Sequence, residues 1–387
     1  MQLRDKTAVV GIGATEFSKN SGRSELQLAA EAVLAALTDA GLTPEDVDGL
    51  CTYTADNNTE AEVARCIGAP NLTFFSQIGF GGGGACGPLH QAMLAVATGV
   101  ADVVVCYRAL NERSGYRFGQ AFSPVVPGSN EALATYHTFH GLMTGAAMFA
   151  LLIRRYMDET GATPEDFGHV AVASRKYAST NPNAFFYGKP ITMADYLNSR
   201  MISDPIRLLD CCQESDGGVA VVVTSTERAK DLRQKPALIR AAAQGSAYQQ
   251  IQVTNYYTQG AIEFKETALV ARQLYQQAHL DPGDIGAAII YDHFIPTVLM
   301  SLEAYGFCKP GEGKDFVKNA NLEIGGELPL NTHGGQVGEA YIHGMNGIAE
   351  AVRQIRGTAV NQVSNLENIL VTAGSGIPTG GVILASA

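Results

Sequence analysis

Apolar residues recur at strand and helix spacing in two distant stretches of the chain, and the order of elements is the same in both. The first stretch predicts a strand, a helix and a second strand, over 8–13, 25–40 and 50–53. The second predicts the same elements over 237–241, 265–279 and 289–291. The turns before the second strand are near copies, Thr43–Val47 and Asp281–Ile285, each with proline at its second position.

A further repeated unit follows in each half. The first half has a glycine-rich run, a helix and a strand, at 81–87, 89–98 and 103–106. The second has His333-Gly-Gly, a helix and a strand, at 333–335, 345–355 and 369–372. Repeated βαβ units in one order predict a duplicated α/β protein, with halves over 1–230 and 231–387.

The segment from about 111 to 201 has no counterpart in the second half. It contains a loop rich in serine, glycine and proline, and its apolar spacing predicts helices near 142–159 and 164–178. We expect an insertion of this size to form a loop domain that supplies substrate contacts and a lid.

Composition excludes several classes of protein. A formal net charge of -11 argues against a nucleic-acid-binding face, which needs basic residues. No run reaches the roughly 18 apolar residues of a membrane span. The 7 cysteines form no CxxC pair, so neither a disulfide framework nor a metal site is expected. With no signal peptide visible, we expect a cytoplasmic protein.

Five phrases then carry a resemblance to a known family. They are Tyr291–Phe294, Asp204–Cys212, Ser215–Ser225, Asn331–Gly335 and Gly344–Gly357. In these phrases the chain resembles the thiolase superfamily, and most closely its sterol-carrier and lipid-transfer branch. The resemblance implies two βαβαβαββ halves packed in five αβαβα layers, with the insertion as a loop domain and a homodimer as the usual unit.

The chain departs from the thiolase pattern at each of its four short motifs. Gly84 aligns with the nucleophilic cysteine, and Cys86 falls two residues later. The second and third motifs carry tyrosines, Tyr291 and Tyr341, and the fourth reads Thr-Ala-Gly, ending at Gly374. No cysteine therefore remains at either catalytic position.

Acyl transfer through a covalent enzyme intermediate needs a thiolate, which this chain lacks at the catalytic positions. The expected activity is therefore chemistry at the enolate of a thioester. The resemblance implies that the backbone N–H groups of Gly84 and Gly374 face the thioester oxygen. Retro-aldol cleavage of a β-hydroxyacyl-CoA needs one base and one acid, and two phenols suit both roles. The residues expected to carry or support these proton transfers are Tyr291, Tyr341, Asp292, His293 and His343.

With tyrosine at both motif positions, the chain also resembles the aldolases of bacterial steroid degradation. This implies cleavage of a 17-hydroxy steroid C22-carboxyl-CoA side chain to a 17-keto steroid and propanoyl-CoA. Such enzymes work with a small OB-fold and zinc-ribbon partner in a heterotetramer. Coenzyme A is expected only as part of the substrate, with no other cofactor.

Two other functions fit the same residues. Cys86 begins a glycine-flanked helix, where a thiolate is stabilised, so a degenerate cysteine thiolase or acyltransferase is an alternative. A non-catalytic acyl-CoA or sterol-binding protein is the other. Tyr291 also has a structural interpretation, because tyrosine is common at strand ends.

Overall fold

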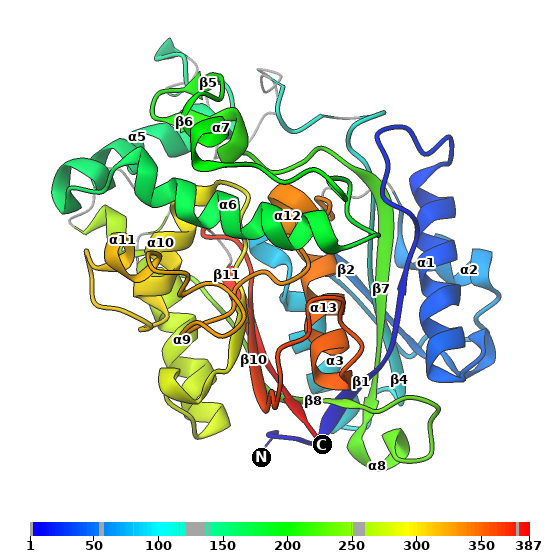
Figure 1. Ribbon diagram of the computed structural model, residues 1–387. Coiled ribbons are helices and arrows are strands. Elements are labelled where there is room, and N and C mark those ends of the chain that lie inside the picture. Colours follow the sequence, from blue (N-terminus) through cyan, green and yellow to red (C-terminus); the bar gives the residue numbers. More distant parts are fainter. Residues whose placement is uncertain are drawn as a thin grey trace.

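The computed structural model describes residues 3–53, 58–79, 81–115, 117–120, 137, 139–248, 250, 260–376 and 379–387. Within these ranges one mixed sheet has the strand order β3-β2-β4-β7-β1-β8-β11-β10-β9 (Figure 1). Its strands are β1 (Thr7–Ala14), β2 (Gly49–Tyr53), β3 (Phe74–Ile78), β4 (Val103–Asn111), β7 (Asp216–Ser225), β8 (Ala237–Gly245), β9 (Ala287–Ile289), β10 (Asn368–Thr372) and β11 (Thr379–Ser386). A separate ribbon pairs β5 (Met201–Ser203) with β6 (Ile206–Arg207).

The sheet consists of two similar parts joined at its middle. β2 runs parallel to β3 and β4 in one part, and β9 runs parallel to β10 in the other. The join is short, because β1 and β8 pair only through Ala8–Leu238 and Val9–Ala237. Strands β1 to β7 precede residue 230 and β8 to β11 follow it, which is the order that the repeated sequence pattern predicts.

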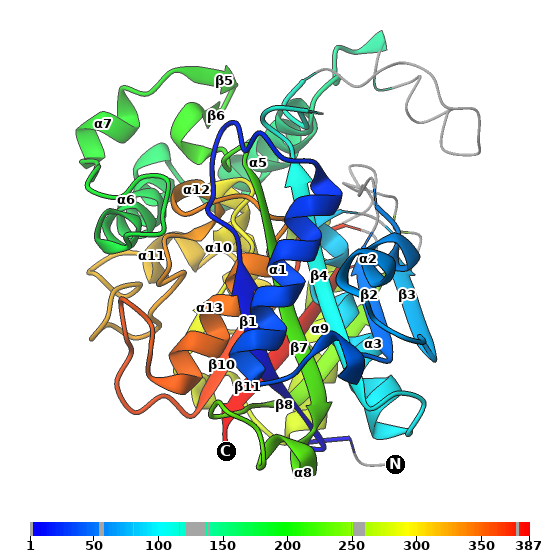
Figure 2. The same ribbon diagram turned by 90° about the vertical axis from the view of Figure 1, so that its right-hand side faces the viewer.

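Helices form three layers around the two parts of the sheet (Figures 1 and 2). The helices are α1 (Glu25–Ala40), α2 (Glu60–Ile67), α3 (Gly87–Ala97), α5 (Gly145–Thr160), α6 (Pro164–Thr180), α7 (Met193–Leu197), α8 (Thr226–Ala229), α9 (Lys265–Ala278), α10 (Ile295–Ala304), α11 (Gly313–Phe316), α12 (Gly335–Gly338) and α13 (Met345–Arg356). α1 and α2 cover one outer face, α9 and α10 the other, and α3 and α13 lie between the two parts of the sheet.

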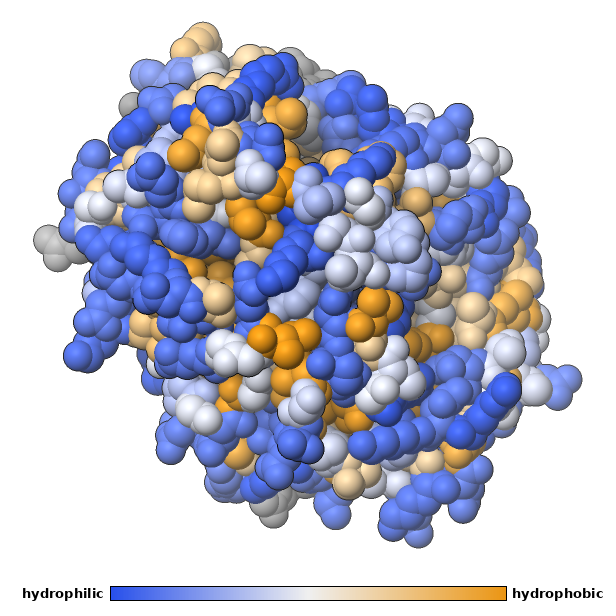
Figure 3. All heavy atoms as spheres, viewed as in Figure 1, coloured by the Kyte–Doolittle hydropathy of each residue, from blue (hydrophilic) through white to orange (hydrophobic). Residues whose placement is uncertain are grey.

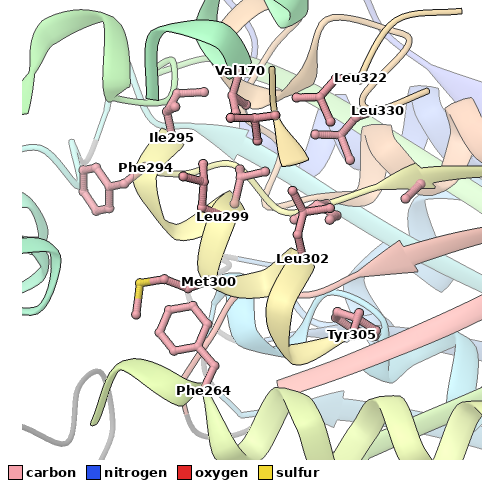
Figure 4. Packing of buried hydrophobic residues seen from close by; sticks show 14 of the residues in the cluster. Val170, Phe264, Phe294, Ile295, Leu299, Met300, Leu302, Tyr305, Leu322 and Leu330 are labelled. Carbon is pink, nitrogen blue, oxygen red and sulfur yellow. The ribbon is translucent and has the colours of Figure 1, made fainter. Parts of the chain in front are cut away.

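Side chains that point alternately to the two faces of the sheet explain these layers of helices. In β4, Val103 and Val105 pack toward α1, whereas Val104 and Cys106 pack toward the central helices. Successive strand residues point to opposite faces, so a strand that is apolar throughout can be covered on both sides. On the far side, residues of α10 such as Ile295 and Leu302 lie among side chains of a third cluster (Figure 4).

Several local expectations are confirmed. The helix predicted over 25–40 is α1, which begins after Ser24 and ends at Gly41 in the left-handed conformation. The two copied turns are both 3-10 helices, Pro44–Asp46 and Pro282–Asp284, each closed by the same capping box. One expectation is wrong in detail, because β9 ends at Ile289 and Tyr291 lies two residues beyond it.

The described part of the insertion is mostly helical, and its helix α6 packs on α12. Ala178 of α6 lies so close to Gly334 and Gly338 that a Cβ on either would approach its Cβ to 2.6 or 2.7 Å. The serine-rich loop predicted over 120–130 falls almost wholly outside the described residues. The face seen in Figure 3 is mostly polar, with apolar residues in separate groups. Among the described helices, none is long and apolar enough to cross a membrane.

Candidate active site

Tyr291 and Tyr341 meet in the middle of the fold. Their hydroxyl oxygens are 3.0 Å apart in a hydrogen bond, and their rings cross edge to face with centroids separated by 6.4 Å. Both side chains are buried. The backbone N–H of Tyr291 donates to Thr372 Oγ1 and that of Tyr341 to Ser215 Oγ, so both halves of the chain fix the pair. The structure thus brings together the two tyrosines that the motifs singled out.

Burial raises the pKa of both tyrosines well above the ordinary value, because a phenolate is poorly solvated there. Their mutual hydrogen bond opposes that rise in the pKa of Tyr291. Two neutral phenols in one hydrogen bond can relay a proton, because one hydroxyl can pass its proton to the other while it accepts a proton from the substrate. That is the operation required of an acid and a base that act in the same turnover.

Three glycines enclose the ring of Tyr291. A Cβ at Gly344 would lie 3.1 Å from one edge of the ring and a Cβ at Gly374 would lie 3.2 Å from the other. A Cβ at Gly82 would lie only 1.9 Å from Tyr291 Oη. Glycine at these positions therefore makes room for the aromatic ring.

One glycine of this loop faces the tyrosine pair directly. Gly84 was expected at the nucleophile position, but its Cβ would point to Gly79 O and Ile78, away from the pair. Gly82 faces Tyr291 instead, because the 3-10 helix Gly82–Gly84 turns successive residues in different directions. A nucleophilic side chain placed at 82 would occupy the space that the Tyr291 hydroxyl fills.

The backbone N–H groups expected to bind the thioester oxygen already have acceptors. Gly84 N–H donates to Gly81 O at 2.9 Å and Gly374 N–H donates to Gly82 O at 3.0 Å. The first bond closes a turn within the glycine loop, and the second holds that loop against the segment that follows β10. The predicted role of these two groups stays a prediction, and it requires the loop to release them.

Cys86 lies in an environment unsuited to a nucleophile. Its side chain is fully buried in the central cluster, where Sγ lies 3.7 Å from Val371 O. Burial raises the pKa of the Cys86 thiol far above its ordinary value, whereas a nucleophile needs it lowered. These contacts are those of a small core residue.

His343 sits beside Tyr341 with its backbone in the left-handed region, at a φ of 48°. Its ring stacks on Phe118 with centroids 4.9 Å apart and meets Tyr341 edge-on at the same separation. Arg108 Nη2 donates to His343 Nδ1 at 3.0 Å. Burial, and then the charge of Arg108, hold the pKa of His343 well below its ordinary value.

His293 and Asp292 diverge from each other after Tyr291. The ring of His293 is 5.2 Å from that of Tyr291, and burial lowers the pKa of His293 to about 3. Asp292 turns toward α12, where its Oδ1 accepts from Gln336 N–H at 2.8 Å. Burial raises the pKa of Asp292 to about 6. Asp292 therefore anchors the loop that leads to Tyr341, and the relay role of His293 stays a prediction.

Sequence reasoning missed three polar residues near the tyrosines, of which Glu112 and Arg108 are buried and Cys212 is partly buried. Burial raises the pKa of Glu112 to about 9, and its charge disfavours ionisation of both phenols. Cys212 is also near them, with its N–H donating to His293 O. Arg108 interrupts the apolar run of β4, a signal that was visible in the sequence. Among the described residues, no cluster of three or more histidine, cysteine or acidic side chains could hold a metal ion.

Comparison with known proteins places the chain among thiolase-like proteins. Residues 245–384 match the family described as "Thiolase C-terminal domain-like". The chain is 62% identical to the steroid side-chain-cleaving aldolase of Thermomonospora curvata, over 99% of both chains. It is 58% identical to the 17-hydroxy-3-oxo-4-pregnene-20-carboxyl-CoA lyase of Mycobacterium tuberculosis, over 99% of this chain and 100% of that protein.

Solved structures agree with this result. A structure described as "Ltp2-ChsH2(DUF35) aldolase" is similar with a TM-score of 0.96 and 60% identity, covering 100% of this chain and 99% of the other. Human mitochondrial 3-ketoacyl-CoA thiolase shares the fold at a TM-score of 0.71 and 15% identity, over 100% of both chains. The predicted thiolase fold is confirmed.

Proposed function

The chain belongs to the thiolase superfamily, among the steroid side-chain-cleaving aldolases, and on that premise we propose that it catalyses a retro-aldol cleavage of a β-hydroxyacyl-CoA. The substrate is a 17-hydroxy steroid C22-carboxyl-CoA, and the products are a 17-keto steroid and propanoyl-CoA. The observation that carries the mechanism is the buried, hydrogen-bonded pair of Tyr291 and Tyr341, with glycine where a nucleophile would stand.

The proton balance of this reaction matches the pair. The substrate hydroxyl loses its proton, the bond between the β- and α-carbons breaks, and a ketone and an acyl-CoA enolate result. The enolate then takes one proton at its α-carbon. One hydroxyl accepts the first proton while it passes its own proton across their hydrogen bond, and the other hydroxyl delivers its proton to the α-carbon, so both tyrosines end as neutral phenols.

Single Tyr291→Phe and Tyr341→Phe variants test this mechanism, assayed by release of propanoyl-CoA together with the partner protein. Each should lower kcat by about 10²–10⁴-fold, as expected when a general acid or base is lost. Tyr187→Phe is the matched control, since Tyr187 is 55% exposed and outside the site. Near wild-type turnover in both site variants would show that the two-tyrosine mechanism is wrong.

A second protein is part of the proposal. The similar structure described as an Ltp2-ChsH2(DUF35) aldolase supports an active form that contains a small partner, here proposed as an OB-fold and zinc-ribbon protein in a heterotetramer around a homodimer of this chain. Size-exclusion chromatography with light scattering, on the chain alone and with the partner, tests both assemblies. Coenzyme A enters only as part of the substrate, and we place the reaction in the cytoplasm.

A further inference from the structure

Arg108 is a fully buried cation in the middle of the fold. It lies on β4 with no exposed surface, although arginine is rarely buried unless its donors are paired. Its Nη1 donates to Tyr53 O at 2.6 Å, and its guanidinium lies 4.9 Å from the centre of the Tyr53 ring. Its Nη2 is directed at His343 Nδ1, 3.0 Å away. One function of this buried charge is therefore to hold that imidazole.

The bond from Arg108 determines which nitrogen of His343 carries the proton. A guanidinium has only donors and stays protonated in proteins, so Nδ1 must accept. The neutral ring then carries its proton on Nε2. Because Arg108 does not give up its proton, Nδ1 can neither receive nor release one, and a relay through both ring nitrogens is blocked.

The proton on Nε2 faces the glycine loop that surrounds the tyrosine pair. A Cβ at Gly81 would lie 3.1 Å from His343 Cε1 and 3.3 Å from Nε2. Phe118 and Tyr341 pack against the ring and fix its orientation. Among the described residues, Nε2 has no hydrogen-bond partner, so it is a donor held in place without an acceptor.

Enolate formation creates a need for such a donor. When the carbon–carbon bond breaks, negative charge develops on the thioester oxygen, and a preorganised donor at that oxygen lowers the barrier. The backbone donors of Gly84 and Gly374 are engaged within the loop. We propose that His343 donates from Nε2 to the thioester oxygen of the substrate, and that Arg108 is the positioning residue that keeps the proton there. The inference rests on the proposed retro-aldol function.

Substitutions of His343 separate a donor from a relay. In His343→Gln the side-chain amide nitrogen reaches about as far as Nε2 and can donate, but it cannot transfer a proton. We expect this variant to keep kcat within about tenfold of wild type, whereas His343→Ala and His343→Asn lose about 10²–10³-fold. If His343→Gln is as inactive as His343→Ala, the inference is overturned. Cleavage of the steroid acyl-CoA by the wild-type protein in the same assay would still support the proposed function.

Two readouts test the role of Arg108, one of them on the wild-type protein without any turnover. In wild-type protein, ¹⁵N NMR should show His343 neutral and protonated on Nε2, its signal being assigned by its disappearance in His343→Gln. A proton on Nδ1 would refute the inference even if no substrate is cleaved. In Arg108→Met the imidazolium still donates from Nε2 but the neutral ring can carry its proton on Nδ1, so kcat/KM should fall as pH rises through a new pKa closer to the ordinary histidine value of about 6.5. Arg108→Lys retains a donor and should suppress that new limb; equal pH profiles in all three proteins would also overturn the inference.

Discussion

Gly82→Ala is the sharpest test of the arrangement around Tyr291. The new Cβ would lie 1.9 Å from Oη and 2.3 Å from Cζ, whereas ordinary contact begins at 3.4 Å. The hydroxyl must therefore move by about 1.5 Å, and the ring cannot turn aside because Gly344 and Gly374 lie against both of its edges. Since a misplacement of about 1 Å can reduce a rate about 10²-fold, we expect kcat to fall by about that factor or more. Overpacking should also cost about 1–3 kcal/mol of unfolding free energy.

The assay is the release of propanoyl-CoA by the complex, with urea unfolding measured in parallel. Gly79→Ala is the matched control, because it lies in the same loop and a Cβ there would meet no atom within 4 Å in the described part of the chain, its neighbours in sequence aside. If Gly82→Ala keeps kcat within twofold of wild type, the space that Gly82 leaves does not position the Tyr291 hydroxyl and the reasoning is refuted.

Three further predictions follow from buried groups. Because burial raises the pKa of Glu112 to about 9, the folded protein holds a proton that the unfolded chain releases from about pH 4.5, so this group's contribution to stability falls as pH rises. Glu112→Gln should therefore gain unfolding free energy relative to wild type between pH 5 and pH 8, and an unchanged difference would contradict that pKa. Gly335→Ala would place a Cβ 2.0 Å from Asp292 Oδ2 at a φ of +67°, so urea titration should show a loss of about 2 kcal/mol or more. Cys86→Ala should lose about 1 kcal/mol of stability with kcat nearly unchanged, and abolished turnover would restore the cysteine mechanism.

The repeated hydrophobic pattern predicted the fold because both copies obey the same local rules. Thr43 and Asp281 cap equivalent turns, and the strands that follow them are apolar enough to be covered on both faces. Boundaries were less certain where no cap marks them. β9 stops at Ile289 because the backbone N–H of Tyr291 is taken by a threonine side chain rather than by a neighbouring strand.

The tyrosine pair was predictable from motif positions, but its surroundings were not. Four consecutive glycines carry no side chains, so the sequence could not show that Gly82 is the glycine that faces Tyr291. Arg108 was visible as a charge within an apolar strand, yet its partner His343 is 235 residues away. Only the folded chain brings such a pair together, since no local pattern encodes their contact.

The two central helices also bear on how the protein folds. α3 comes from the first half of the chain and α13 from the second, yet one apolar cluster joins both helices to both parts of the sheet, from Val221 of β7 to Leu384 of β11. β11 is the last strand in chain order and lies between β8 and β10. During synthesis the part of the first half's inner face that α13 covers must therefore stay exposed until the second half has been made, and a chaperone that shields apolar strands can act in that interval.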